Sequence, residues 1–446
     1  MKNKYYKDQT EAGINSFGKR QSPYELIRAF AEVKKAIFFA IQEYKSFYTN
    51  DDFEIIIEAI DEIIEGKHND QFPLDLAQGG AGTSLHMNIN EVISSLVYEK
   101  TNGKLSLDYI DDCARYQSTN DTFPTAIRIV LYRMLIDIEK NVIALQEILV
   151  AKEKEYHGTL MTARTELQDA LPMDLGQVFG AWAGMIERDR WRLNKLKERI
   201  RSVPLGGTAV GTGFFAPQQY VYKAERFLQQ ITGLPLCRSQ NLPDAIAHHD
   251  ELSELASGIK IIAQNIYKIT NDLLKYTSSQ YGEMTHISKQ YGSSIMAAKS
   301  NPVLLEYIKG LVISTEYECD KASRFCSEGE MQLNAFIPFA LKSFLYIDNN
   351  INNALDTLKE FLLNNLEINR EKMTVNLLKS NAILNTLRPL VSYHKIKEAS
   401  VQLQKLDIKT IDEFIDNLST ITGLSKETLK KWMNPDHLTG YTKEIE

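Results

Sequence analysis

Two apolar stripes constrain the fold of this chain more than any other feature of its sequence. The stripes consist of Leu131, Leu135, Ile138, Val142, Leu145 and Leu149, and of Ile259, Ile262, Ile266, Ile269, Leu273 and Tyr276. Their heptad-like spacing keeps one side of a long helix against another helix. Because the two stripes lie far apart and strand-like alternation is scarce, the sequence predicts an all-α protein. We expect a bundle of long helices, associating within one subunit or across subunits.

Capping patterns predict the domain limits. A chain of 446 residues is long enough for two or three domains. Asn120 and Asp121 are N-cap residue types and Pro124 suits a first helical turn, so we place a boundary near residue 123. Ser425 as an N-cap and Asn434-Pro435 as a stop indicate a small helical module that begins near residue 377. The predicted domains are 1–123, 124–376 and 377–446.

The composition excludes several classes of protein. A net charge of -7 gives no basic footprint for nucleic acid. No window approaches the roughly 18 apolar residues of a membrane helix, and the polar start lacks the apolar core of a signal peptide, so we expect a cytoplasmic protein without membrane contact. The four cysteines show neither a C-x-x-C pair nor zinc-like spacing, which favours free thiols.

Four segments concentrate glycine, hydroxyl and amide residues between helical stretches. They are Gly79–Glu91, Gln117–Asp121, Ala163–Met173 and Tyr291–Pro302, with Gly206–Gly213 reinforcing the last. In the first, glycines let backbone N–H groups approach an anion, and Thr83 and Ser84 add hydroxyl donors. The second precedes a helix, where free N–H groups and the helix dipole favour a carboxylate. Taken alone, the second also fits plain capping, and the third fits a solvated helix face.

The fourth segment identifies a family. Its residues Gly292 to Pro302 resemble the signature loop Gly-Ser-Ser-x-Met-Pro-x-Lys-x-Asn-Pro of the aspartase/fumarase superfamily, with Ala297 in place of the internal proline. Further segments match that family in order and approximate spacing: Gly82–Ser84 with Met87-Asn88, Ser118–Asp121, Arg164-Thr165 with Leu167–Ala170, Gly206–Gly213, Gln332–Asn334 and Leu424–Gly440. The resemblance covers nearly the whole chain. It implies an N-terminal helical domain, a central bundle and a small C-terminal helical domain, assembled as a homotetramer whose active sites each draw on three subunits.

The resemblance also implies a chemistry and a set of site residues. Family members remove a group from a dicarboxylate and leave fumarate. Ser293 would be the base that takes the Cβ proton, giving an aci-carboxylate. Lys299, Asn301 and Thr165 would hold the α-carboxylate; Thr83, Ser118, Thr119 and Ser294 would hold the β-carboxylate, with Ser84 beside them; Asn120 and Glu166 would face the leaving group.

The third segment favours one branch of the family. The order Thr-x-Leu-Gln-Asp-Ala-Leu-Pro-Met, which begins at Thr165, looks more like aspartase than fumarase, so we expect ammonia release from L-aspartate or a close analogue. Glu166 replaces the usual histidine or glutamine; a carboxylate there would favour an amine leaving group over a neutral hydroxyl. The alternatives are a fumarate hydratase, a paralogue acting on an N-substituted aspartate, a catalytically idle scaffold, and an adenylosuccinate- or argininosuccinate-type lyase.

Histidines mark two further points of interest. His86 stands where the family often has asparagine. His248 and His249 precede Asp250, but a single His-His-Asp run fits polarity at the surface or at a subunit contact better than a metal site. The implied chemistry needs no redox cofactor, and we predict no cofactor and no metal ligands, leaving open a divalent ion at an activating site.

Overall fold

The computed structural model describes residues 4–287, 292, 294–296, 299–380 and 382–441, which are mostly helical. Within these residues the strands form three two-stranded ladders. They are β1 (Leu160–Thr165) antiparallel to β2 (Gln168–Asp174), β3 (Ser202–Val203) parallel to β4 (Cys237–Arg238), and β5 (Met284–His286) antiparallel to β6 (Leu366–Ile368). The predicted helical class is therefore confirmed, with these short ladders as the exception.

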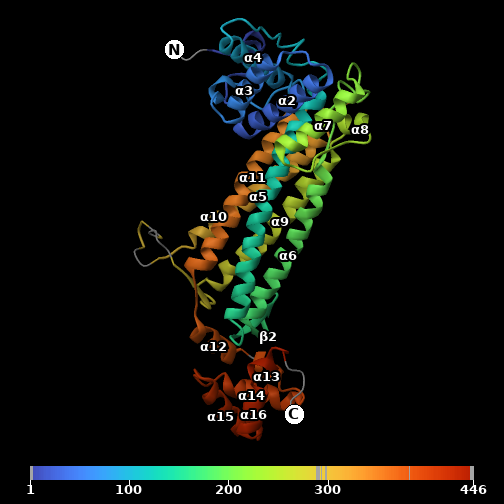
Figure 1. The fold of residues 1–446 in the computed structure, drawn as a ribbon. Coiled ribbons are helices and arrows are strands. Elements are labelled where there is room, and N and C mark those ends of the chain that lie inside the picture. Colours follow the sequence, from blue (N-terminus) through green and yellow to red (C-terminus); the bar gives the residue numbers. More distant parts are fainter. Residues whose placement is uncertain (1–3, 288–291, 293, 297–298, 381, 442–446) are drawn as a thin grey trace. The chain divides into compact units, whose positions relative to one another are not determined.

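Each of the two predicted apolar stripes lies on one of the five longest described helices, which are labelled in Figure 1. These helices are α5 (Thr119–Glu155), α6 (Leu175–Ile200), α9 (Asp250–Tyr276), α10 (Val303–Cys326) and α11 (Ile337–Glu360). All six members of the α5 stripe are fully buried, as are the α9 stripe members up to Leu273. Polar pairs join neighbouring helices, for example Lys197 with Glu139 at 2.6 Å and Lys260 with Asp320 at 2.7 Å. The prediction of long helices packed against one another is confirmed.

The start of α5 differs slightly from the sequence prediction. The Ser118 carbonyl already accepts hydrogen bonds from the N–H groups of Asp121 and Thr122, and the Ser118 hydroxyl accepts one from the N–H of Asn120. Ser118 therefore caps the helix, so the predicted caps at Asn120 and Asp121 are wrong by two to three residues. Pro124 consequently lies beyond the first turn and has no N–H to donate to the Asn120 carbonyl.

The first of two compact units comprises residues 4–140, 191–263 and 313–352. Besides parts of the long helices and the β3–β4 ladder, it contains α1 (Asp8–Phe17), α2 (Tyr24–Lys45), α3 (Asn50–Ile64), η1 (Asn69–Gln71), α4 (Thr83–Lys100), α7 (Gln218–Thr232) and α8 (Leu242–Ala247). Helix α2 packs against α3 and α7, and α1 packs against α4. Along α2 the side chains of Phe30, Ile37 and Ile41 are buried, and the charged Lys34 is buried among them.

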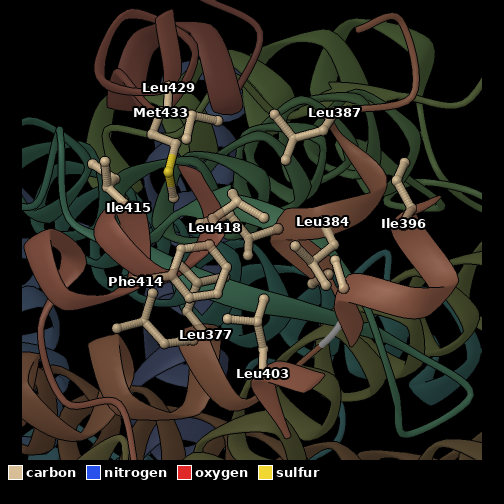
Figure 2. Packing of buried hydrophobic residues seen from close by; sticks show 14 of the residues in the cluster. Leu377, Leu384, Leu387, Ile396, Leu403, Phe414, Ile415, Leu418, Leu429 and Met433 are labelled. Atoms are coloured by element: carbon tan, nitrogen blue, oxygen red, sulfur yellow. The ribbon is translucent and has the colours of Figure 1, made fainter. Parts of the chain in front are cut away.

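The second unit comprises residues 141–190, 264–312 and 353–441. It contains the other parts of the long helices, the remaining strands, η2 (Phe361–Asn365), α12 (Arg370–Lys379), α13 (Ala382–Asn385), α14 (Tyr393–Leu403), α15 (Ile411–Thr422), α16 (Lys426–Trp432) and α17 (Pro435–Leu438). Helices α12 to α17 share an apolar core in which Leu377, Phe414 and Leu418 are buried (Figure 2). Ser425 caps α16 and Asn434 caps α17, which confirms the helix start and stop predicted there.

Candidate active site

Three of the singled-out segments meet in the first unit. Gly82, with a φ of 90°, precedes α4, and a Cβ on it would lie 2.7 Å from the Phe123 ring of α5. A larger residue would push these two helix starts apart, so the glycine allows a close approach. Thr83 and Ser84 begin α4; Thr83 is exposed and its hydroxyl donates to the Gly80 carbonyl at 2.8 Å.

Asp121 joins the start of α5 to the glycine-rich loop 206–213. Its carboxylate is 1% exposed and accepts hydrogen bonds from three backbone N–H groups, those of Ser118 at 3.0 Å, Gly206 at 3.2 Å and Thr208 at 2.9 Å. The Asn120 side chain donates to the Ala209 carbonyl at 2.8 Å. One buried carboxylate thus holds the backbone at Ser118 together with the backbone of the glycine-rich loop.

A buried chain of polar side chains lies behind Thr119. Lys34 Nζ of α2 is 2.6 Å from His86 Nε2 of α4, and His86 Nδ1 is 2.9 Å from Thr119 Oγ1. Lys34 and His86 are at most 1% exposed. Burial lowers the pKa of Lys34 to about 7; burial and the neighbouring Lys34 charge hold the pKa of His86 well below its ordinary value, so its imidazole is neutral.

The buried Asp121 carboxylate makes the stability of this unit depend on pH. Burial raises its pKa to about 6, and the backbone hydrogen bonds offset part of that rise. A raised carboxyl pKa contributes stability below the unfolded value of 3.8, and this contribution is lost as the pH rises through about 6. At ~1.4 kcal/mol per pH unit, we expect wild type to lose roughly 3 kcal/mol relative to Asp121→Asn over that window. Urea unfolding of both proteins at several pH values measures this difference; a constant difference would contradict the assignment.

The third segment forms a β-hairpin in the second unit, not the helix face that it would also fit. Thr165 pairs with Gln168, and the two residues between them, Glu166 and Leu167, have φ angles of 54° and 64°. This two-residue turn with positive φ at both positions matches the right-handed twist of the strands, although neither residue is glycine. Thr165 and Glu166 are exposed at its tip. Glu166 lines a cavity of about 280 Å³ together with Lys268, Lys275 and Tyr276.

A buried ion pair holds the base of this tip. Arg164 donates two hydrogen bonds, at 2.8 and 2.7 Å, to the carboxylate of Glu283, which is fully buried. The same carboxylate accepts a hydrogen bond from Asn376 at 2.9 Å, and the Arg164 guanidinium lies 4.3 Å from the centre of the Tyr281 ring. Because Arg164 immediately precedes Thr165, this ion pair positions the predicted carboxylate-binding hydroxyl.

The signature loop is described in part. Ser293 and Ala297 lie outside the described residues. Asn301 donates from its side chain to the Gly292 carbonyl at 2.5 Å, and the Lys299 N–H donates to the Met296 carbonyl at 3.0 Å. Ser294 and Lys299 are exposed.

The predicted site residues thus form one group in each unit. Thr83, Ser84, Ser118, Thr119 and Asn120 belong to the first unit; Thr165, Glu166, Ser294, Lys299 and Asn301 belong to the second. The structure adds supporting residues that the sequence analysis missed. Lys34 had a signal, since it is a charged residue on the apolar stripe of α2, whereas Glu283 carries no local pattern.

The histidine pair and the helices bear on two sequence predictions. His248 is exposed and hydrogen-bonds Asp244 at 2.8 Å, but His249 is 1% exposed, so the prediction of surface or contact polarity is wrong for His249.

Across the described ranges, histidine, cysteine and acidic side chains form no group of three suited to a metal ion. None of the helices in those ranges is long and apolar enough to span a bilayer.

Known proteins share the sequence pattern and the fold of this chain. A family model described as a lyase matches residues 2–314. Aspartate ammonia-lyase of Bacillus subtilis (strain 168) is 33% identical over 423 residues, covering 93% of this chain and 88% of that protein. Class II fumarate hydratase of Haemophilus influenzae is 32% identical over 459 aligned residues, covering 99% and 97%. The fumarate lyase:delta crystallin from Brucella melitensis bound to cobalt superposes with a TM-score of 0.90 at 30% identity, covering 99% of this chain and 96% of that one.

The fold and the match to the family model define this protein as a lyase built on a helix bundle. A class II fumarase from Schistosoma mansoni shares the fold with a TM-score of 0.86 at 23% identity, over 98% of this chain and 96% of that one. The chain belongs to the aspartase/fumarase superfamily, which confirms the resemblance carried by its motifs.

Proposed function

We propose that this protein eliminates ammonia, or an amine, from L-aspartate or a close analogue and releases fumarate. The third segment carries the proposal: Glu166 is exposed at a hairpin tip, beside a cavity, within an aspartase-like run that begins at Thr165. A carboxylate at this tip attracts an ammonium leaving group, whereas it gains nothing from a neutral hydroxyl. The B. subtilis aspartate ammonia-lyase is similar over 93% of the chain.

The proposed reaction begins at the substrate Cβ. Ser293, as its alkoxide, takes the Cβ proton, and the electron pair moves into the adjacent carboxylate to form an aci-carboxylate. The Cα–N bond then breaks, the double bond of fumarate forms and the amine leaves. A serine alkoxide is costly in water, so the loop N–H groups and Lys299 must stabilise it, at ~3–4 kcal/mol per oriented donor.

In this proposal, the other site residues bind the two carboxylates and the amine of the substrate. Ser118, Thr119, Thr83 and Ser294 hold the carboxylate on which charge builds up, so their hydrogen bonds strengthen in the transition state. The start of α5 suits this role, because the positive end of the helix dipole favours an anion there. Lys299, Asn301 and Thr165 hold the other carboxylate, and Asn120 and Glu166 face the amine.

We further propose the assembly that the family resemblance implies, a homotetramer whose active sites combine residues of three subunits. Supporting this, large apolar side chains remain exposed on the long helices of the first unit, among them Trp191 at 62% and Tyr317 at 73%. Association of subunits would remove such exposed apolar side chains from water. The division into domains at residues 123 and 376 remains a prediction alongside it.

A substrate panel tests the proposed function. Purified protein is incubated with fumarate plus ammonia, hydroxylamine or simple amines, or with water alone, and fumarate absorbance is followed. We expect fumarate to be consumed when an amine is present and not in water alone. Consumption of fumarate in water alone would instead support the alternative, fumarate hydratase. The similarity to the H. influenzae fumarate hydratase over 99% of the chain is the observation in favour of that alternative. No consumption under any condition would contradict both and favour an idle scaffold.

Replacing Glu166 tests its role toward the leaving group. We expect Glu166→Gln to lower kcat/KM for amine addition by at least about tenfold, because general acid–base groups contribute ~10²–10⁴-fold and the amide neither ionises nor donates an acidic proton. Asp169→Asn is the matched control, since Asp169 is an exposed carboxylate on the same hairpin. An unaltered rate and KM in Glu166→Gln would remove Glu166 from the mechanism.

A further inference from the structure

In the buried chain from Lys34 to Thr119, the donor and the acceptor of each hydrogen bond can be assigned. Three acceptors surround Lys34 Nζ: His86 Nε2 at 2.6 Å, the Cys113 carbonyl at 2.9 Å and Gln117 Oε1 at 2.6 Å. An ammonium group has three protons and no lone pair, so it matches this set and donates to each acceptor. The Gln117 amide is oriented accordingly, because its Nε2 donates to the Cys113 carbonyl at 3.1 Å.

The cation fixes the tautomer of His86. Since Nε2 accepts a hydrogen bond from Lys34, the neutral imidazole must carry its one N–H proton on Nδ1. Nδ1 lies 2.9 Å from Thr119 Oγ1, so it donates to that hydroxyl oxygen. The hydroxyl proton of Thr119 then has to point away from His86, which makes Thr119 a donor toward any neighbouring group.

We propose that His86 is a positioning residue that locks the Thr119 hydroxyl as a hydrogen-bond donor to the substrate carboxylate. This inference rests on the proposed function, in which Thr119 holds the carboxylate where charge develops. A carboxylate accepts hydrogen bonds and cannot donate them. A hydroxyl whose O–H bond rotates freely would first have to turn toward the substrate, and this would cost part of the binding free energy of the substrate. The Lys34–His86 pair removes that cost before the substrate arrives.

The substitutions His86→Asn and His86→Leu distinguish orientation of the Thr119 hydroxyl from simple packing by the His86 side chain. An asparagine amide reaches about as far as Nδ1 and still has an N–H group for Thr119, whereas leucine keeps the bulk and loses both contacts. We expect His86→Leu to lower kcat/KM by about 10- to 100-fold, the value of a hydrogen bond to a charged group. His86→Asn should stay within about threefold of wild type. In a Thr119→Val background, His86→Leu should cause no further loss.

A spectroscopic test needs no activity measurement and locates the proton in the wild-type protein. Imidazole ¹⁵N spectra of the wild-type protein, recorded at about pH 6, below the pKa of Lys34 of about 7, report which nitrogen carries the proton. The His86 signals are assigned by their loss in His86→Asn. We expect protonated Nδ1 and unprotonated Nε2.

The outcomes separate this inference from the proposed function. A wild-type protein that turns over no dicarboxylate contradicts the proposed function. An active wild-type protein with its His86 proton on Nε2 overturns the inference. So does a His86→Leu variant with unchanged kcat/KM, or full additivity of His86→Leu and Thr119→Val.

Discussion

Ser293→Ala is expected to lose about 10²–10⁴-fold in kcat, the contribution of a positioned general base, while KM changes by less than about threefold. The methyl side chain has no oxygen to accept the Cβ proton, yet the groups that hold the two carboxylates remain. Release of fumarate from L-aspartate, followed by absorbance, gives both constants. Retention of wild-type kcat would remove Ser293 as the base and with it the assigned mechanism.

Ser300→Ala is the matched control on the same loop. Its hydroxyl lies 3.1 Å from His286 Nε2, and it is not among the proposed catalytic or binding groups. We expect its kcat to stay within about threefold of wild type. An equal loss in Ser293→Ala and Ser300→Ala would show that any lost hydroxyl disturbs the loop, and the specific role of Ser293 would not stand.

The second large effect is expected in stability. Glu283→Ala should lower the free energy of unfolding by about 3–5 kcal/mol, because removing one partner of a buried ion pair leaves the other uncompensated. Arg164 would lose both of its hydrogen bonds to Glu283, and Asn376 would lose an acceptor. Urea unfolding measures the loss, and kcat/KM should fall as well because Thr165 follows Arg164 directly.

Asp169→Ala separates this buried pair from an exposed one on the same guanidinium. Asp169 lies 3.2 Å from Arg164 Nε and its side chain is 48% exposed. Exposed ion pairs contribute about 0–1 kcal/mol, so we expect at most that loss. Comparable losses in Glu283→Ala and Asp169→Ala would contradict the assigned importance of burial.

Much of the fold was predictable from the sequence because helix periodicity is a local pattern. The stripe from Leu131 to Leu149 identified α5, and the Ser425 cap identified α16. The third segment was harder, because Glu166 and Leu167 are not typical residues for a turn with positive φ. That turn is held from outside the hairpin, by the contact of Arg164 with a distant Glu283, and no local pattern reveals such a contact.

In the candidate site, the sequence indicated the motif residues but not the residues that orient them. Motif residues such as Thr119 were identified by resemblance, but the groups that orient them lie elsewhere in the sequence. Lys34 precedes His86 by 52 residues, and Asp121 binds backbone of a loop more than 80 residues later. Distances of this kind are created by tertiary packing, which a single sequence does not display.

The hairpin turn at Glu166 and Leu167 bears on how such lyases diversify. The two residues at the tip are exposed and lie outside the core, while the structure that fixes the tip is the buried pair below it. In the proposed mechanism, a substitution at residue 166 would therefore change the side chain that faces the leaving group at little cost to folding. If residue 166 acts on the leaving group as proposed, such a separation would let one scaffold change the eliminated group through single mutations while each variant remains folded.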